Sequence, residues 1–471
     1  MNARQFFSLT TLAAALAGCA VGPDYQRPVS DLPQRYGEAD EGTSPEANVQ
    51  RDWWKLFNDP VLDRLVEQAL ARNTDVLAAV ARVEEADAAL REVGAALLPE
   101  IDLDVSGNRS RASSMTAVPM PAGTPVHRDA RAVSLGTAFE IDVWGKLRRA
   151  SEAARAQALA SRYARDTVRL SLAGLVAADY LALRAYDAQL AAVADSRASR
   201  DASLKIVRSR VEGGVSSPLE LHQAEASLAA VQAQLAGLRQ QRAVTQHQLA
   251  LLAGTPDLGL PASDLGGFGH LPVPPVPPAG LPSRLLEARP DVRQAEEGLV
   301  AANARIGVAK AALFPTISLT GSLGSESQAL ADLFTRASST WSLGLGLAVP
   351  VFDAGRNAAR LDQASAREKQ ALAAYQKTVQ TAFKEVNDAL VGLRENAASE
   401  EAQALRSEAA QKALRLAQLR YEAGYSGYLE VLDAQRTSND AITGFITARK
   451  ARLAAAVDLF KALGGGWAAD R

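Results

Sequence analysis

The chain has little of the residue types that most often carry chemistry. Its 471 residues include one cysteine, Cys19, so intramolecular disulfides are excluded. It has four histidines, and none of them is spaced from another as metal ligands usually are: His127, His222, His247 and His270. A formal net charge of −2 gives no global field that would attract nucleic acid or an acidic partner. We therefore expect no metal and no catalytic cofactor.

Nucleotide-binding and hydrolase motifs are incomplete. Gly344-Leu345-Gly346 begins like a dinucleotide-binding loop, but Val349 stands where the third glycine belongs. Gly424-Tyr425-Ser426-Gly427 does not match the nucleophile elbow of hydrolases. We predict that the protein is not an enzyme. Aromatic residues make up only 5% of the chain while alanine is abundant, which favours long, closely packed helices over a large globular core.

The N-terminus has a short apolar stretch, from Phe6 to Leu16, that follows the basic Arg4. It is too short to span a membrane as a helix and has the layout of a signal peptide. It ends in Leu16-Ala17-Gly18-Cys19, which resembles the bacterial lipobox, in which the cysteine is acylated, for example with palmitate. We predict a covalent lipid on Cys19, and the outer membrane as its location because Ala20 is not an aspartate. The alternative is an ordinary buried or removed cysteine.

The rest of the chain repeats itself. Leu97-Leu98-Pro99-Glu100-Ile101 returns 216 positions later as Leu313-Phe314-Pro315-Thr316-Ile317. Arg210-Val211-Glu212-Gly213-Gly214 returns 210 positions later as Arg420-Tyr421-Glu422-Ala423-Gly424. Two landmarks with nearly one offset indicate two copies of one structural unit. The predicted parts are a signal peptide (1–18), an extended lipidated arm (19–60), a first repeat (61–254), a Pro-rich linker (255–283) and a second repeat (284–471).

Each repeat contains two segments in which apolar residues alternate with small or polar ones, a period that predicts β-strands. About ten residues is the length that a tilted strand needs to cross a membrane. Polar, turn-like segments join the paired strands, as in the outward loops of membrane barrels. A soluble sheet, which also alternates, is the alternative. The four strands are predicted at about 100–108, 132–143, 316–324 and 340–351.

Helical periodicity fills the remainder of each repeat. One helix is predicted from Pro60 to Ala96, with its counterpart from Ser283 to Ala312, each ending before a proline. Lys146 to Val211 contains no proline, so we predict a helix about 100 Å long, at ~1.5 Å per residue. Such a helix requires a packed neighbour along its length. The return helix of the first repeat is predicted to begin at residue 218. In the second repeat the long helix is predicted at 354–422 and its return helix at 429–463.

Four strands cannot close a barrel in lipid, because an open edge leaves backbone groups without hydrogen bonds. Two chains would form a narrow barrel filled by side chains, whereas three would form twelve strands around a lumen. The predicted fold is therefore mainly α with a membrane β-barrel. It is a homotrimer with four strands per chain and a long helical coiled-coil extension.

At this point the chain resembles a known family, the TolC-like outer-membrane efflux factors, and specifically their OprM-like lipoprotein branch. The resemblance covers essentially all of 19–467. It rests on motifs that are moderately specific alone and strongly specific in this order: Val21-Gly22-Pro23-Asp24-Tyr25, Asp52-Trp53-Trp54, Leu281-Pro282-Ser283 with Arg289-Pro290-Asp291-Val292, Ala309-Lys310-Ala311-Ala312-Leu313-Phe314-Pro315, Phe352-Asp353-Ala354-Gly355-Arg356, Tyr428 to Arg436, and Lys461 to Trp467.

The resemblance implies a homotrimeric duct of the Gram-negative outer membrane that extends into the periplasm. A periplasmic adaptor and an inner-membrane proton-driven pump would deliver small toxic or amphipathic compounds, which leave through the duct passively. Two alternatives stay open. One is a duct for ATP-driven protein secretion, and the other is a non-conducting structural lipoprotein.

The resemblance also implies roles for residues at the far end of the long helices. Leu429 and Asp433 would form an apolar and a charged ring of a periplasmic gate, with Tyr421 and Arg436 as latches. The alternative is an ordinary i,i+3 pair of Asp433 with Arg436 and simple packing of Tyr421. Adaptor docking is expected at the tip turns, where the glycines have the alternative role of allowing a sharp turn. The docking residues are Gly213, Gly214, Ser217, Pro218, Gly424 and Gly427.

Overall fold

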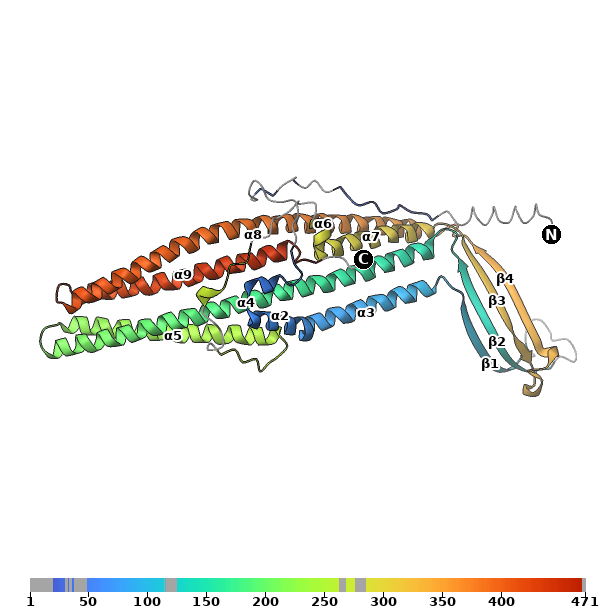
Figure 1. The fold of residues 1–471 in the computed structure, drawn as a ribbon. Coiled ribbons are helices and arrows are strands. Elements are labelled where there is room, and N and C mark those ends of the chain that lie inside the picture. The colour runs from blue at the N-terminus through green and yellow to red at the C-terminus, as the bar shows by residue number, and fades with distance from the viewer. Residues whose placement is uncertain are drawn as a thin grey trace. The chain divides into compact units, whose positions relative to one another are not determined.

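The computed structural model describes residues 20–29, 33, 36–37, 49–113, 115, 125–261, 268–275 and 285–467 (Figure 1). The predicted signal peptide and Cys19 lie outside the described residues, as do 262–267 and 276–283 of the predicted linker and residue 284 of the predicted second repeat. The chain forms two compact units. The sheet unit consists of residues up to Val29, Val83–Ser161 and Ala295–Tyr375, and the hairpin unit consists of Ser30–Arg82, Arg162–Gln294 and the residues from Gln376 onward.

The sheet unit contains one antiparallel sheet in the order β1-β2-β3-β4 (Figure 1). Its strands are β1 (Glu100–Arg111), β2 (His127–Ile141), β3 (Thr316–Ser327) and β4 (Ser339–Ala348). The second repeat therefore continues the sheet of the first through the pairing of β2 with β3. The first hairpin reaches further than its apolar alternation indicates, since Arg111 still pairs with His127. β4 ends at Ala348, three residues before the predicted end at 351.

The two faces of the sheet differ in chemistry. Register places Leu103, Leu135, Leu323 and Trp341 in one row across all four strands. The next row, on the opposite face, is Asp102, Gly136, Ser322 and Ser342. The apolar side chains are strongly exposed in the single chain, with Trp341 at 76% and Leu345 at 73%. A face of this kind requires an apolar environment to cover it.

The long helices repeat with the same lengths. α4 (Lys146–Glu212) and α8 (Arg356–Glu422) have 67 residues each, and α5 (Pro218–Leu252) and α9 (Tyr428–Ala462) have 35 each. In the hairpin unit α5 returns beside α4 and α9 returns beside α8 (Figure 1). The expected continuous helices are present because no proline interrupts them and because apolar heptad positions pack within each hairpin. Val193, Val231, Leu235 and Leu238 form such a cluster.

The shorter helices differ from the sequence-based expectation. The single helix predicted from Pro60 to Ala96 is two helices, α2 (Pro60–Arg72) and α3 (Thr74–Ala95). Asn73 is extended, its side chain accepts a bond from the Asp75 amide at 2.8 Å, and its amide group donates to the Leu252 carbonyl at 3.0 Å. A side chain that competes for backbone groups in this way ends a helix.

The counterpart predicted from Ser283 to Ala312 is broken at the equivalent place, into α6 (Leu285–Ala288) and α7 (Pro290–Ala311). Arg289 precedes a proline, which disfavours helical backbone at that residue. Its guanidinium donates to the Ala462 carbonyl at 3.1 Å, so each break is bonded to the last residue of a return helix. The other helical segments within the described ranges are short 3-10 turns: Trp53–Phe57, Phe268–His270, Leu330–Asp332 and Arg336–Ser338.

The N-terminal arm is bonded to the sheet unit. The Val21 amide donates to the Trp144 carbonyl at 3.0 Å, at the junction of β2 and α4. Arg27 forms a bidentate pair with Glu296, at 2.6 and 2.9 Å, and the Tyr25 hydroxyl donates to the same carboxylate. Burial, followed by the negative charge of Glu296, raises the pKa of Tyr25, so its hydroxyl stays protonated as a donor. The arm is thus fixed by charge-assisted bonds as well as by packing.

A buried carboxylate organises the centre of the hairpin unit. Asp59 is the N-cap of α2 and accepts bonds from the Val61 and Leu62 amides. The same carboxylate accepts bonds of 2.6 Å from the Tyr180 hydroxyl and from the Arg184 guanidinium of α4. One side chain therefore caps one helix and joins it to another. Among the described residues, no helix is both long and apolar enough to cross a membrane.

We expect Asp59→Ala to lower the free energy of unfolding of the hairpin unit by about 3 kcal/mol, because it leaves a buried guanidinium without its carboxylate. Denaturant unfolding of the purified protein, followed by circular dichroism, measures this change. Asp52→Ala is the matched control, since Asp52 is half-exposed and its carboxylate pairs with Lys55 of the 3-10 turn Trp53–Phe57. Equal midpoints for the two variants would contradict the role of Asp59.

Candidate functional site: the tips of the hairpins

The two tip turns have the same backbone structure. Gly214 has φ +75° and Gly424 has φ +80°, a left-handed conformation that favours glycine. The Val215 amide bonds to the Arg210 carbonyl, and the Tyr425 amide bonds to the Arg420 carbonyl 210 positions later. This pattern ends a helix tightly and reverses the chain. The glycines predicted at the tips thus have a conformational role in the single chain.

The return helices begin with different caps. The Ser217 hydroxyl accepts a bond from the Leu219 amide at 3.1 Å, and Pro218 follows at the first helical position. Gly427 caps α9 without a side-chain bond. Gly213, Gly214, Ser217 and Pro218 lie together at the first tip, and Gly424 and Gly427 lie at the second. The tips therefore share a backbone but present different surfaces.

A small core joins the ends of the two hairpins. It contains Leu204 and Val207 from α4, Ala224 from α5, Ala417 and Tyr421 from α8, and Tyr428 and Val431 from α9. The rings of Tyr421 and Tyr428 are 5.6 Å apart. Arg210 lies over the Tyr421 ring at 4.3 Å and donates to the Tyr421 carbonyl at 3.4 Å. This cation–π contact links the first hairpin to the second.

Sequence reasoning missed Arg210 as a linking residue. The motif that contains it indicates the duplication, and nothing in the motif distinguishes Arg210 from its counterpart Arg420. The structure does, because Arg420 pairs with Glu430 within its own hairpin at 3.4 Å.

The four predicted gate residues divide between a surface and a core. Leu429 is 65% exposed, and Asp433 and Arg436 follow it at i+4 and i+7 on the same face of α9. Asp433 and Arg436 form an exposed ion pair at 2.8 Å within α9. In the single chain they therefore make the ordinary i,i+3 pair that is the alternative to a gate. Tyr421 is buried on α8, and its hydroxyl has no hydrogen-bond partner within the described part of the chain. A ring at a gate needs several chains, so the gate stays a prediction.

The contacts between the two hairpins above the tip are polar. Gln418 bonds to Ser199 at 3.2 Å, Gln435 bonds to Ser203 at 3.1 Å, and Asn439 bonds to Gln234 at 3.1 Å. The buried Arg200 donates to the Ser227 carbonyl at 2.9 Å, and burial lowers its pKa. The two hairpins are thus joined by hydrogen bonds as well as by the apolar core at the tip, and the heptad pattern does not show these bonds.

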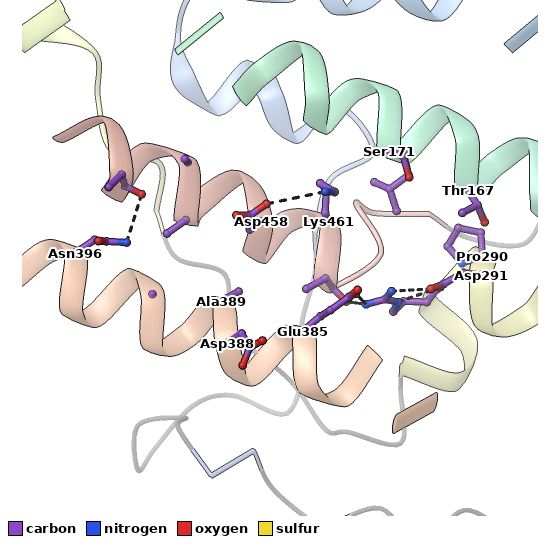
Figure 2. Close-up of a pocket in the computed structure, with 17 residues that line it drawn as sticks. Thr167, Ser171, Pro290, Asp291, Glu385, Asp388, Ala389, Asn396, Asp458 and Lys461 are labelled. Carbon is purple, nitrogen blue, oxygen red and sulfur yellow. Dashed lines mark hydrogen bonds and ion pairs between the residues drawn. The ribbon is translucent and has the colours of Figure 1, made fainter. Parts of the chain in front are cut away.

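A second feature of the hairpin unit is a cavity of about 670 Å³ lined by α4, α7, α8 and α9 (Figure 2). Four carboxylates and two cations line it, and these charged groups lie in ion pairs. Arg289 pairs with Asp291 at 2.6 Å and with Glu385 at 2.7 Å, and Asp388 pairs with Lys384. No group of three or more potential metal ligands exists among the described residues. The cavity has neither a free nucleophile with a base nor a ligand set for a metal.

Comparison with known proteins assigns this geometry to a family. The family described as "Outer membrane efflux protein" matches residues 65–255 and 281–465. The solvent efflux pump outer membrane protein SrpC of Pseudomonas putida is 36% identical over 477 residues, covering 99% of this chain and 100% of its own. The cation efflux system protein CusC of Escherichia coli is 34% identical over 472 residues, covering 97% of each chain.

A solved structure agrees over nearly the whole length. The CmeC outer membrane channel of Campylobacter jejuni superposes with a TM-score of 0.88 at 26% identity, covering 96% of each chain. The predicted resemblance to the TolC-like family is confirmed. The predicted fold is confirmed as well: it is mainly helical with four strands per chain, and trimeric channels of this type close such strands into one barrel. The prediction that the protein is not an enzyme is confirmed by the family.

These matches also confirm the predicted location, the outer membrane with an extension into the periplasm. The chain belongs to the outer membrane efflux protein family and is the outer membrane exit channel of a tripartite efflux system.

Proposed function

We propose that three copies of this chain form a lipid-anchored duct that passively conducts small toxic or amphipathic compounds to the exterior. A periplasmic adaptor and an inner-membrane proton-driven pump deliver them. The observation that carries the proposal is the four-stranded sheet. It has one exposed apolar face, and both of its edges, β1 and β4, pair with no other strand of the described chain.

The sheet edges argue for closure between chains. A strand edge in lipid leaves its amides and carbonyls without partners, which costs several kcal/mol per group. Pairing β4 of one chain with β1 of the next removes every edge, and three chains give twelve strands. The apolar row that includes Leu103 and Trp341 then faces lipid, and the row of Asp102, Gly136, Ser322 and Ser342 faces the lumen.

The lumen-facing side chains argue for passive, weakly selective conduction. They are mainly serine, threonine, glycine and alanine, with carboxylates along β1, and such small side chains offer little to distinguish one compound from another. Cargo is then selected upstream, by the pump. The names of the relatives agree with this reasoning, since SrpC belongs to a solvent efflux pump and CusC to a cation efflux system.

The tips are the proposed contact with the adaptor, and α9 the proposed gate. Gly214 and Gly424 hold the chain in tight turns, so the ends of the hairpins present backbone to a partner. In the gate, Leu429 supplies an apolar ring and Asp433 a ring of carboxylates. The exposed guanidinium of Arg436 is available to a neighbouring chain, whereas the hydroxyl of Tyr421 is buried in the single chain and would have to be uncovered to act as a latch.

The N-terminal arm supports a lipid anchor at Cys19. The bond from Val21 to Trp144 fixes the arm at the end of β2. Two residues of extended chain reach at most about 7 Å. Acyl chains on Cys19 would therefore enter the membrane beside the base of the sheet, where they add to the anchoring by the barrel. We propose no other cofactor.

Deletion of the gene tests the proposed cargo. We expect increased susceptibility to at least one class among drugs, dyes, organic solvents and metal ions, with secreted proteins unchanged. Complementation with the intact gene is the control. Unchanged susceptibility together with the loss of a secreted protein would show that the duct serves protein secretion instead. If the purified protein conducts no ions in planar bilayers, the protein is a structural lipoprotein and not a duct.

Asp433→Ala is expected to raise the resting conductance of the purified channel in planar bilayers, because it removes the partner of Arg436 and the charged ring. Glu408→Ala is the matched control, since it removes one exposed carboxylate of α8 that pairs with Lys412. Equal conductance of the two variants would remove Asp433 from the constriction.

Cys19→Ser is expected to abolish labelling of the protein by a radioactive fatty acid, because the thiol is the acyl acceptor. Part of the protein should still fractionate with the outer membrane, since the barrel remains. Acyl label that persists in this variant would refute the assignment of Cys19.

A further inference from the structure

The apolar face of the sheet becomes cationic toward the far end of the β1–β2 hairpin. Along β1 the residues of this face are, in chain order, Ile101, Leu103, Val105, Gly107, Arg109 and Arg111. Their partners on β2 are, in the same order, Thr137, Leu135, Val133, Arg131, Asp129 and His127. Both strands change beyond the paired row of Val105 and Val133. The change at one register indicates a single boundary across the hairpin.

The apolar part of this face has a height close to that of a membrane's hydrocarbon layer. On β2 it extends from Val133 to Ile141, which is about 26 Å of strand at ~3.3 Å per residue. A strand tilt of about 35–45° reduces this length to a height of roughly 20 Å, near the roughly 25 Å apolar band of membrane barrels. Because α4 follows the Ile141 end of β2, the opposite end, with Arg131, lies at the outer surface.

β4 ends its apolar row in the same direction with an aromatic residue. Trp341 lies on the apolar face opposite Leu323, and the next residue of that face toward the outer end is Ser339. Trp341 is 76% exposed in the single chain. Aromatic residues form girdles at the boundary between hydrocarbon and headgroups. The tryptophan therefore supports a headgroup boundary near the outer end of the sheet, independently of the arginines.

The arginines beyond this boundary keep donors for a ligand. The side chain of Arg109 is 80% exposed and forms one ion pair, with Asp129 at 3.4 Å. Arg131 donates to the Gln328 carbonyl, and Arg111 is exposed. Each guanidinium carries five N–H groups. Three guanidinium groups accompany the single carboxylate of Asp129, so this end of the face is cationic.

The opposite face at the same end has a different composition. Its residues on the two strands are Asn108, Ser110, Arg128 and Ala130. The arginines thus concentrate on the face that is apolar further along the strands. Arginine on the lipid-facing side of a barrel is strongly unfavourable at the membrane midplane and nearly neutral at the interface. Arg109, Arg111 and Arg131 occupy the part of that face where the cost is small.

We propose that Arg109, Arg111 and Arg131 bind the phosphate groups of a glycolipid in the outer leaflet of the outer membrane. This inference rests on the proposed barrel, in which the apolar face meets lipid. A guanidinium presents its N–H groups as a fork that matches phosphate oxygens. Lipid phosphates lie directly outside the hydrocarbon, which is where the register places these side chains. The bound lipid would cover the apolar rows with its acyl chains and the arginines with its headgroup.

Binding of diphosphoryl lipid A to the detergent-solubilised trimer, measured by native mass spectrometry, tests the proposal. We expect the combined change Arg109→Gln, Arg111→Gln and Arg131→Gln to weaken binding about tenfold or more, because each basic residue adds attraction to an anionic headgroup. Arg109→Gln alone should weaken binding to a smaller extent. Its matched control is Arg128→Gln, which removes one arginine from the opposite face of the same hairpin end. Equal affinities of these two single variants would overturn the proposal.

Two other lipids identify the chemistry that is recognised. Phosphatidylglycerol and lipid A without its phosphates should each bind the unmodified trimer about tenfold more weakly than diphosphoryl lipid A. Phosphatidylglycerol that binds equally well would assign the surface to anionic lipids in general and refute the glycolipid. Lipid A that binds equally well without phosphates would show that the acyl chains suffice and would refute the arginine site.

Chromatography and conductance separate this inference from the duct on which it rests. The triple variant should elute as a trimer and conduct like the unmodified channel in planar bilayers, because its altered side chains face lipid. A changed conductance would place the arginines in the lumen and overturn the proposal. Unchanged affinity for lipid A in a conducting trimer refutes the site and keeps the duct. Unmodified protein that is monomeric or conducts no ions refutes the duct itself. If the triple variant does not assemble, Arg109→Gln still decides.

Discussion

Hydrogen bonding at the two edges of the sheet is the constraint on which the rest of this protein depends. β1 and β4 carry backbone groups that lipid cannot satisfy, so a single chain is not a finished membrane structure. The apolar face that includes Trp341 and Leu345 adds a second demand of the same kind. Closure by further copies answers both demands.

Two kinds of contact divide the hairpin unit. Within a hairpin, residues such as Val193 and Leu235 pack at heptad positions and bury apolar surface. Between hairpins, amides and hydroxyls meet, as in the bonds of Gln418 with Ser199 and of Gln435 with Ser203. A typical hydrogen bond of this kind contributes only about 1 kcal/mol net, because water competes for the same groups. At the tip the two hairpins also share an apolar core, and the Arg210–Tyr421 contact lies beside it.

Duplication preserved backbone geometry while side chains diverged. The helix breaks at Asn73 and Arg289 bond to equivalent carbonyls, those of Leu252 and Ala462. At the second break a guanidinium replaces an amide, and it brings Asp291 and Glu385 into the charged lining of the cavity. The tips also keep one backbone geometry with different side chains, since Ser217 caps α5 and Gly427 caps α9. Equal offsets in sequence thus identify equivalent places even where the residues differ.

The sequence alone determined the elements that depend on local chemistry. Absence of proline from Lys146 to Val211 predicted a helix that is observed as Lys146–Glu212, and period-two alternation predicted four strands. What it missed depends on partners distant in the chain. Asn73 ends a helix because it also reaches Leu252, and β1 extends to Arg111 because His127 lies opposite it. Only tertiary structure brought Arg210 onto Tyr421 and separated the buried Tyr421 from the exposed Leu429, because residues far apart in sequence must pack before either contact exists.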